Sequence, residues 1–426
     1  MLRRTVTTGL AAAALAAPLV LGALPAAAQQ TTLRVFIGGQ QRPDVMRPLM
    51  DLFQQQNPGV RVEIEVGGAT SEAQQQYLTT VLTSRDPAID VMLIDVVRPA
   101  QFAAAGWAEP LDAYLGGTDR ATVLRRYLPG YAEAVVVDNK LMSLPAFADA
   151  MFLYYRTDLL QKYGLQPPRT WEETVSHARR IMAGENNPNL QGLNFQGAPI
   201  EGTNCTFLIP FWQLGGNLVG ANNRVTVNND AGRGAFQFWL DAMRTHRVSP
   251  ANSAEVRTDD TRLQFQNGNV AFAVLWAYGW NLFQSEQSQV RGKVGVVPLP
   301  TFQGRQSATC IGGWQWAVSA FSRNKPDAAK LVQFLASGVA SKHLAINASN
   351  LPVLPDLYRD PDVLRTNPWF EAALPVVITA RSRPVSPRYP EVSEIIRTNV
   401  NGVIAGTKTP QAALTEMESR LQRVLR

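Results

Sequence analysis

Two carboxylates of this chain lie where expected strands begin or end. Asp95 directly follows the continuous apolar run 91–94, and Asp149 comes shortly before the apolar stretch 151–155. In mostly parallel sheets, ligands bind beyond the carboxyl ends of the strands. We therefore expect Asp95 at a binding site, and a helix cap or a turn is the alternative role for both acids.

Aromatic side chains occupy the same kind of position. Trp276 and Tyr278 lie at the end of an expected strand, and Trp314 follows the glycine pair Gly312 and Gly313. A flat ring packs well against the C–H face of a pyranose, while neighbouring carboxylates accept hydrogen bonds from its hydroxyls. The combination favours sugar binding. Core packing is the alternative role of Trp276 and Trp314, and it is the favoured role of the other tryptophans.

Signals for catalysis are weak by comparison. The three histidines, His177, His246 and His343, are widely separated, and the chain has no G-x-S-x-G, P-loop or dinucleotide fingerprint. Metal-dependent and nucleophilic chemistry therefore have little support. Two carboxylates across a cleft could hydrolyse a glycoside, so a glycoside-cleaving enzyme stays as an alternative. We predict no catalytic residue, no metal and no cofactor.

The first 28 residues match a secretory signal peptide. Arg3 and Arg4 precede the apolar stretch 10–24, and the alanines 26–28 form a cleavage site, which we place after Ala28. The arginine pair leaves twin-arginine export open. No cysteine lies near the cleavage site, so we expect no lipid anchor and a protein free in the periplasm.

Composition narrows the class further. Hydrophobic residues make up 46% and charged residues 17% of the 426 residues, which is typical of globular chains of this length with two domains. The net charge of +6 includes Arg3 and Arg4, and the other basic residues are scattered. This pattern disfavours nucleic acid as a partner.

The elements that must position these side chains alternate between strand and helix. In the first part of the chain, strands are expected at 33–37, 60–66 and 91–94, with helices around 45–53 and 77–82. Later elements include a hairpin at 135–145, strands at 151–155, 270–276, 293–297 and 316–320, and helices at 171–181, 231–245, 328–336 and from 410 onward. The alternation predicts an α/β fold with a mostly parallel sheet.

Over nearly the whole mature chain, the sequence resembles the sugar-binding proteins of ABC importers, closest to the trehalose/maltose-binding branch. The resemblance rests on an ordered set of stretches: 57–60 (NPGV), 90–95 (DVMLID), 102–107 (FAAAGW), 144–156 (LPAFADAMFLYYR), 201–205 (EGTNC), 265–280 (FQNGNVAFAVLWAYGW), 311–314 (IGGW), 383–385 (RPV) and 389–393 (YPEVS). Each stretch is weak alone, and the ordered set is specific.

The resemblance implies the periplasmic binding protein fold, with two α/β lobes around a ligand cleft that are joined by crossing hinge segments. It places 29–142 plus about 300–338 in the N-terminal lobe, and 143–299 plus about 339–426 in the C-terminal lobe. It also implies a monomer that delivers its sugar to membrane permease subunits with a cytoplasmic ATPase. Cys205 and Cys310 could form a disulfide in an oxidising compartment, and free buried thiols are the alternative. Because a bridge between the lobes would oppose closure, we expect no such bridge.

The same resemblance assigns roles in the site. It implies that Asp95 and Asp149 accept hydrogen bonds from sugar hydroxyls, that Trp276 and Trp314 stack on the sugar, that the backbone near Gly313 makes a polar contact, and that Arg383 donates. Phe147, Glu201, Tyr278 and Gln41 complete the expected ligand-binding residues. For Arg383, a surface salt bridge is the alternative.

Departures from the family pattern bear on the identity of the ligand. Relatives that bind trehalose or maltose often carry Tyr where Phe147 stands, an aromatic residue where Ile200 precedes Glu201, and Glu near Gln40 and Gln41. Such changes can switch specificity, because sites that bind hydroxyls reject analogues that lack them. The ligand is expected to be a disaccharide or glucoside. The alternatives are a polyol, a longer oligosaccharide or a glycerol-phosphate-type solute.

Overall fold

The structure is a computed structural model that describes residues 1–2, 5, 30–220 and 224–425. The expected signal peptide therefore lies almost entirely outside the described residues. Among the described residues, no helix combines the length and the apolar character that a membrane span requires.

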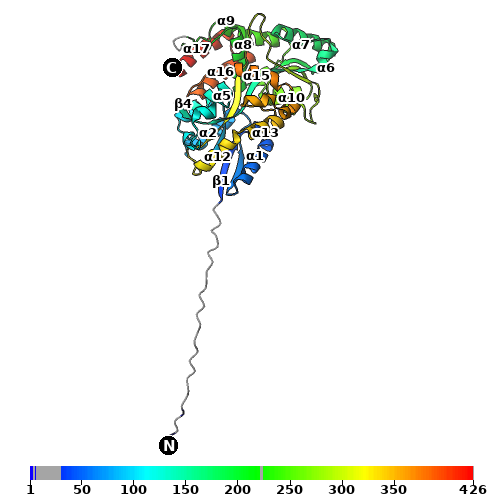
Figure 1. The fold of residues 1–426 in the computed structure, drawn as a ribbon. Coiled ribbons are helices and arrows are strands. Elements are labelled where there is room, and N and C mark those ends of the chain that lie inside the picture. Colours follow the sequence, from blue (N-terminus) through cyan, green and yellow to red (C-terminus); the bar gives the residue numbers. More distant parts are fainter. Residues whose placement is uncertain (3–4, 6–29, 221–223, 426) are drawn as a thin grey trace.

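The described part of the chain builds one eight-stranded mixed sheet with helices packed around it (Figure 1). The α/β class is as expected, but the prediction of a mostly parallel sheet is wrong, because β10 and β6 cross the middle of the sheet antiparallel to their neighbours. Its strand order is β2-β1-β3-β10-β6-β8-β7, and β9 pairs with β6. The strands are β1 (Thr31–Ile37), β2 (Val60–Val66), β3 (Val91–Asp95), β6 (Leu144–Arg156), β7 (Gln191–Asn194), β8 (Val270–Trp276), β9 (Val294–Val297) and β10 (Ile311–Val318). A separate hairpin pairs β4 (Val136–Val137) with β5 (Lys140–Leu141).

The first half of the sheet follows the expected alternation of strand and helix. β1 pairs in parallel with both β2 and β3, and the connections are α1 (Pro43–Gln56) and α2 (Ser71–Thr83). Thr70 caps α2 by accepting a hydrogen bond from the backbone N–H of Ala73. All five residues of β3 are buried, as its unbroken apolar run predicts.

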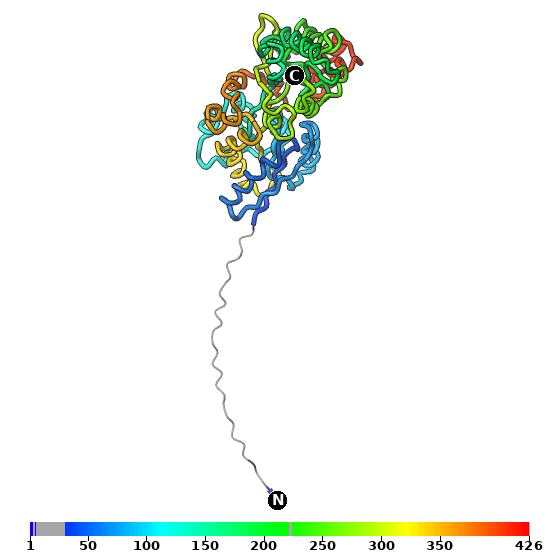
Figure 2. The backbone as a smooth tube through the Cα atoms, turned by 90° about the vertical axis from the view of Figure 1, so that its right-hand side faces the viewer, coloured from blue at the N-terminus to red at the C-terminus, as the bar shows by residue number. Residues whose placement is uncertain are grey.

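The long strand β6 joins the two halves of the sheet. Its first part pairs antiparallel with β10, and its second part pairs antiparallel with β8 and β9. Side chains of the first half pack in two hydrophobic clusters, and those of the second half pack in a larger one. Figure 2 shows the same arrangement from the side, with the blue N-terminal elements at one end of the folded part and the green elements at the other.

Helices cover both halves of the sheet. Those of the first half and its surroundings are α3 (Pro99–Ala104), α4 (Arg120–Leu124), α5 (Pro129–Ala134), α12 (Lys325–Leu335) and α13 (Gly338–Ala348). Those of the second half include α6 (Thr157–Lys162), α7 (Trp171–Glu185), α8 (Glu201–Gln213), α9 (Asp230–Leu240), α10 (Thr258–Gln266), α11 (Gly279–Phe283), α14 (Pro361–Thr366), α15 (Phe370–Thr379), α16 (Tyr389–Ala405) and α17 (Pro410–Val424). Only half of the capping box expected at 170–173 is present. Thr170 accepts from the N–H of Glu173, but the Glu173 carboxylate accepts from the N–H of Arg169, one residue before the N-cap.

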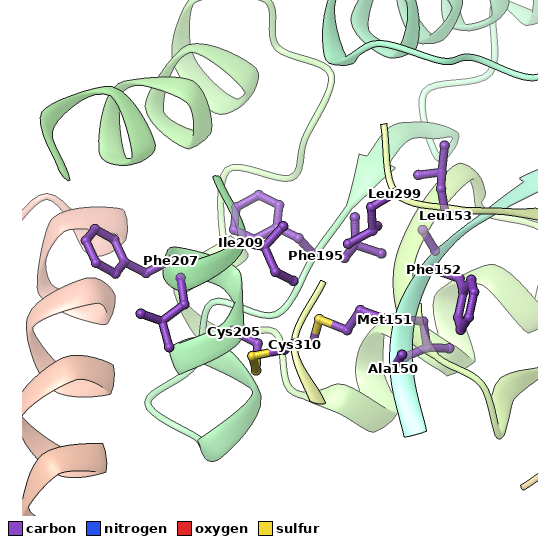
Figure 3. Packing of buried hydrophobic residues seen from close by; sticks show 14 of the residues in the cluster. Ala150, Met151, Phe152, Leu153, Phe195, Cys205, Phe207, Ile209, Leu299 and Cys310 are labelled. Atoms are coloured by element: carbon purple, nitrogen blue, oxygen red, sulfur yellow. A yellow bond between two sulfur atoms is a disulfide. The ribbon is translucent and has the colours of Figure 1, made fainter. Parts of the chain in front are cut away.

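A disulfide joins Cys205 in α8 to Cys310 just before β10, so the expectation that these cysteines remain unbridged is wrong. Their Cα atoms lie 5.8 Å apart, within the range that a disulfide requires. Both cysteines are fully buried in the same hydrophobic cluster, among side chains such as Met151 and Phe207 (Figure 3). The bridge therefore lies inside one packed core.

Candidate ligand-binding site

A cavity of about 220 Å³ lies between the two halves of the molecule, and all ten expected ligand-binding residues line it. They are Gln41, Asp95, Phe147, Asp149, Glu201, Trp276, Tyr278, Gly313, Trp314 and Arg383. One water needs about 10–15 Å³ of such space, so the cavity has room for a ligand many times that size. The structure thus brings together residues from seven separate stretches of the chain.

Three adjacent strands set the relative positions of the central side chains. Trp314 in β10 lies opposite Asp95 of β3 on one side and opposite Phe147 of β6 on the other. A register shift follows Trp314, which is the signature of a bulge that re-aims a side chain. Trp314 and Trp276 are both partly exposed, whereas Trp316, two residues further along β10, is fully buried.

The glycine pair lets strand and ring approach each other closely. A Cβ atom on Gly312 would lie 2.5 Å from the ring of Trp276, so a side chain there would displace the ring. Gly313 has a φ of 115°, which only glycine adopts readily, and a Cβ there would lie 2.5 Å from the carbonyl oxygen of Phe147. The two glycines are therefore required for the shape of the cavity.

Backbone N–H groups bind one of the two carboxylate oxygens of Asp149. Its Oδ1 accepts hydrogen bonds from the N–H groups of Ala150 and Ala277, each at 2.9 Å. Among the described residues, no hydrogen bond ends on its Oδ2. Burial raises the pKa of Asp149 to about 7, with a smaller contribution from Asp95, although the two N–H donors oppose the shift. Asp149 therefore has one carboxylate oxygen that can form a hydrogen bond with a ligand.

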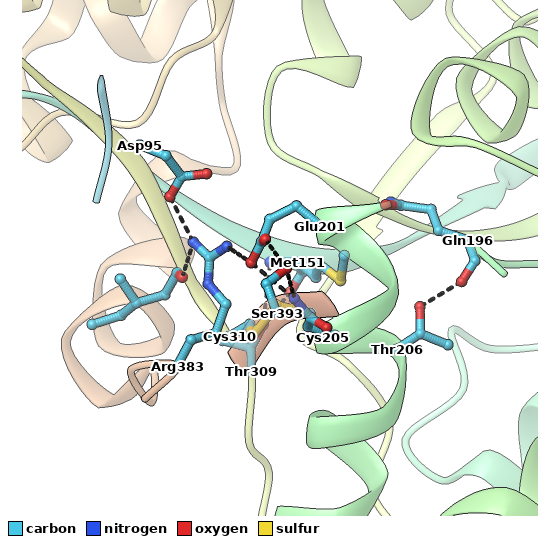
Figure 4. Close-up of a disulfide and its surroundings, with 12 residues drawn as sticks. Asp95, Met151, Gln196, Glu201, Cys205, Thr206, Thr309, Cys310, Arg383 and Ser393 are labelled. Atoms are coloured by element: carbon cyan, nitrogen blue, oxygen red, sulfur yellow. Dashed lines mark hydrogen bonds and ion pairs between the residues drawn. A yellow bond between two sulfur atoms is a disulfide. The ribbon is translucent and has the colours of Figure 1, made fainter. Parts of the chain in front are cut away.

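Arg383 lines the cavity and links the two halves of the molecule through Asp95 and Glu201 (Figure 4). Its Nη2 donates to Asp95 at 3.0 Å, and its Nη1 donates to Glu201 at 2.7 Å. The Arg383 side chain is 2% exposed, so the alternative of a surface salt bridge is wrong. Burial alone would lower the pKa of Arg383, but Asp95, Tyr389 and Glu201 raise it well above its usual range.

Glu201 lies at the start of α8, and its hydrogen-bond partners all act as donors. Asn204, Ser393 and Tyr389 donate to its carboxylate in addition to Arg383. Burial by itself would raise the pKa of Glu201, but Arg383 and then Arg98 and these hydrogen bonds lower it to about 2. Glu201 is therefore a permanent anion whose acceptor capacity the protein itself largely uses.

The cavity is also lined by polar residues that the sequence interpretation did not single out. They are Ser71, Glu72, Arg257, Thr258, Asp259, Asp260 and Asn350. The Tyr278 hydroxyl donates to Asp259 at 3.3 Å, and the Gln40 amide donates to the same carboxylate at 3.4 Å. Acidic residues at the first turns of α2 and α10 look like ordinary helix-start residues in sequence, and this hides their second role.

Other aromatic residues near the expected site belong to the core or the surface. Trp212 is buried in the large hydrophobic cluster and lies under the guanidinium of Arg381. Trp280 donates its indole N–H to the carbonyl of Thr366 and does not line the cavity. Core packing is thus the role of Trp212, as expected for the tryptophans outside the site.

An α/β fold with a ligand cavity between two halves, lined by aromatic rings and buried carboxylates, defines a solute-binding protein. The model of the bacterial extracellular solute-binding protein family matches residues 38–338, and the chain belongs to that family. Members are substrate-binding components of ABC transporters rather than enzymes. The chain is accordingly a solute-binding component of an ABC transporter, and this family membership implies membrane transporter subunits as its partners.

Individual relatives agree with this assignment. A probable ABC transporter-binding protein of Deinococcus radiodurans is 35% identical, and the match covers 83% of this chain and 84% of that protein. Maltose-bound MalE3 of T. maritima superposes with a TM-score of 0.87 at 33% identity, covering 92% and 99% of the two chains. A solute-binding protein of Thermotoga lettingae bound with α-D-tagatose shares the fold, with a TM-score of 0.83 at 24% identity and coverages of 93% and 100%.

Proposed function

We propose that this protein is the periplasmic binding component of an ABC importer for a disaccharide or glucoside of the trehalose/maltose type. The observation that carries the proposal is the pairing of two partly exposed tryptophans with a partly unsatisfied buried carboxylate in one cavity. Trp276 and Trp314 offer ring faces, and Asp149 offers Oδ2 as an acceptor. This is the combination that a pyranose requires, since it has apolar C–H faces and hydroxyl edges.

The likeness to maltose-bound MalE3 supports the same ligand class, because it covers nearly the whole of both chains at 33% identity. The ten ligand-binding residues are part of this proposal. Asp95 and Asp149 accept from hydroxyls, Trp276 and Trp314 stack, and the Gly313 backbone makes a polar contact. Both Nη groups of Arg383 donate to carboxylates, so Arg383 contributes to sugar binding as one member of a cluster with Asp95 and Glu201.

Binding is coupled to closure of two lobes. The proposed N-terminal lobe comprises 29–142 and about 300–338, and the C-terminal lobe comprises 143–299 and about 339–426. A sugar that contacts both lobes shifts the population toward the closed form. The size of this shift is set by how much more tightly the sugar binds the closed form than the open form. The permease subunits then receive the closed, loaded protein. The signal peptide at 1–28 directs the chain to the periplasm.

Thermal unfolding of the mature protein against a panel of solutes tests the proposal. The panel contains trehalose, maltose, sucrose, glucosylglycerol, mannitol and glycerophosphodiesters. A ligand at 100 times its Kd stabilises the folded state by about 2.7 kcal/mol, which raises the midpoint visibly. We expect a shift with a gluco-disaccharide or glucoside that is recovered intact.

Two outcomes contradict the proposal. A shift with only mannitol or a glycerophosphodiester replaces the disaccharide by another solute class. Cleavage of the sugar during incubation replaces the binding protein by an enzyme.

A further inference from the structure

Arg42 lies between the short helix η1 (Gly39–Gln41) and α1, and its side chain reaches the other half of the molecule. Its Nη1 donates a hydrogen bond of 3.1 Å to Oδ1 of Asn281 in α11. Helix α1 packs in a hydrophobic cluster of the first half of the sheet, whereas α11 packs in the cluster of the second half. Among the described residues, no backbone hydrogen bond joins α1 to α11. The contact between the halves is therefore made here by side chains.

The first half of the molecule fixes the rest of the Arg42 side chain. Its Nε donates to Oδ1 of Asp44 at 3.0 Å, and its Nη2 donates to Oδ2 of Asp44 at 2.7 Å. This bidentate pair lowers the pKa of Asp44. Arg42 also has a φ of 52°, a backbone conformation that a residue with a side chain keeps only where its surroundings fix it. Arg42 is thus held with its Nη1 directed at the opposite half.

The hydrogen bond between Arg42 and Asn281 lies next to the cavity in sequence on both sides. Residues 40–41, which directly precede Arg42, line the cavity from the first half, and Trp276 and Tyr278 line it from the second half. Neither Arg42 nor Asn281 is itself among the described residues that line it. The contact therefore joins two walls of the cavity without occupying the space of a ligand.

A second, longer hydrogen bond joins the same two walls. The Gln40 amide donates to Oδ2 of Asp259 at 3.4 Å. Oδ1 of Asp259 accepts from Arg262 and from Tyr278, each at 3.3 Å, so the second half holds this carboxylate in place. Gln40 and Asp259 both line the cavity, so changes there would alter the ligand's surroundings as well. Arg42 and Asn281 are therefore the pair that reports on contact between the halves alone.

Arg156 provides a matched comparison within the same chain. Its Nε and Nη2 donate to the two carboxylate oxygens of Asp158 at 2.7 and 2.6 Å, as those of Arg42 do to Asp44. Its Nη1, however, donates to the carbonyl of Gly268 at 3.2 Å, within the second half. The two arginines share one local arrangement, and they differ in whether Nη1 crosses between the halves.

We infer that Arg42 and Asn281 are positioning residues whose hydrogen bond stabilises the closed form and thereby raises ligand affinity without contacting the ligand. A hydrogen bond of this length is lost when its partners move a few ångströms apart, so it exists only while the two halves lie together. A contact found only in the binding-competent form raises apparent affinity by raising the population of that form. This inference rests on the proposed function and names a protein contact that favours closure.

Titration calorimetry and stopped-flow dissociation with variants of both partners test the inference. The ligands are trehalose, maltose, sucrose and glucosylglycerol. Arg42→Met and Asn281→Ala each remove one partner, and the double variant removes both. Asn281→Asp replaces the neutral acceptor by a charged one, and Arg156→Met is the control. Circular dichroism confirms folding, and Asn281→Ala carries the test if Arg42→Met does not fold.

We expect each single variant to weaken sugar binding roughly threefold to tenfold, which corresponds to one net hydrogen bond, and to release the sugar faster. The double variant should lose no more than the larger single loss, because both substitutions remove the same bond. Asn281→Asp should bind more tightly than the wild type, since charge-assisted hydrogen bonds are stronger. Arg156→Met should lower stability and leave the affinity unchanged.

Three outcomes overturn the inference alone, given a wild type that binds one of the sugars. They are unchanged affinity in Arg42→Met or, if that variant does not fold, in Asn281→Ala; additive losses in the double variant; and a loss in Arg156→Met equal to that in Arg42→Met. If the wild type binds none of the four solutes, the proposed function fails, and the inference fails with it.

Discussion

Glu201 and Asp149 are both buried carboxylates that line one cavity, yet their pKa values move in opposite directions. Glu201 has a pKa of about 2, and Asp149 has a pKa of about 7. The two pKa values differ because the groups next to the two carboxylates differ. Glu201 faces the guanidinium of Arg383, whereas Asp149 receives only neutral backbone N–H groups. In this cavity, the nearby cation lowers the pKa of a buried carboxylate more than the two backbone donors do.

The comparison separates two tasks within one site. The Arg383 region, with Asp95 and Glu201, holds strand β3, helix α8 and the segment before α16 together and has little bonding capacity left. The Asp149 region leaves one carboxylate oxygen beside Trp276 for a ligand. Changes in the first region should therefore act mainly on stability, and changes in the second should act mainly on affinity.

The largest expected effect comes from removing the cation. Arg383→Met leaves Asp95 and Glu201 buried without their partner, and breaking such a pair costs about 3–5 kcal/mol. Urea unfolding measures the loss. Arg388→Met, which removes an exposed partner of Glu391, serves as the control and should change stability little. Equal stability of the two variants would show that the Arg383 region does not hold the halves together.

A pH series sharpens the contrast between the two carboxylates. The pKa of Asp149 rises from 3.8 to about 7 on folding, so the folded state binds more protons between these values, and the free energy of unfolding falls as pH rises through this window. Asn cannot titrate. The stability of Asp149→Asn relative to the wild type should therefore increase by roughly 2 kcal/mol from pH 5 to pH 8.

Glu201→Gln provides the opposite half of this series. The pKa of Glu201 falls from 4.5 to about 2 on folding, so its contribution is complete above pH 4.5 and is lost as pH falls through about 2. The stability difference between this variant and the wild type should be constant from pH 5 to pH 8. Identical pH profiles for the two variants would contradict the contrast.

Ligand affinity should depend on the Asp149 region. Asp149→Ala and Trp276→Ala should each weaken sugar binding at least about tenfold, or 1.4 kcal/mol, because one removes an acceptor and the other a stacking face. Calorimetric titration with the sugar that stabilises the wild type measures both. Unchanged affinity in the folded double variant would refute the assignment of the site.

The smallest effect concerns a single hydrogen bond of the Arg383 region. Tyr389→Phe removes one donor to Glu201, which keeps its bonds from Arg383, Asn204 and Ser393. We expect a loss of about 1 kcal/mol in the free energy of unfolding and no change in sugar affinity. A loss of affinity larger than the loss of stability would mean that Tyr389 or Glu201 contacts the ligand directly.

Much of the fold is readable from local sequence patterns. The alternation at 60–66 predicts β2, the buried run 91–94 predicts β3, and Asp138 and Asn139 form the turn of the expected hairpin, with φ values of 47° and 58°. Strand β10 begins five residues earlier than the expected strand at 316–320. Its Gly312 and Gly313 resemble a turn in sequence, but in the structure they allow the strand to lie close to Trp276 and Phe147.

The site is readable in part. The aromatic residues and the acids at strand ends form recognisable patterns, and all of them line the cavity. Glu72 and Asp259 have no such pattern, because an acid in the first turn of a helix is common for reasons of the helix dipole alone. Their position at the cavity depends on how α2, α8 and α10 meet, and contacts between residues more than 100 positions apart have no local signature.

The disulfide between Cys205 and Cys310 makes the stability of the fold depend on the compartment in which the protein is located. The two cysteines are separated by 105 residues, and closing a loop of that length stabilises a fold by about 4–5 kcal/mol in the chain-entropy model. Thiols stay reduced in the cytosol and oxidise outside it. The chain is therefore less stable during synthesis than after export, and the destination compartment supplies the last covalent step of its maturation.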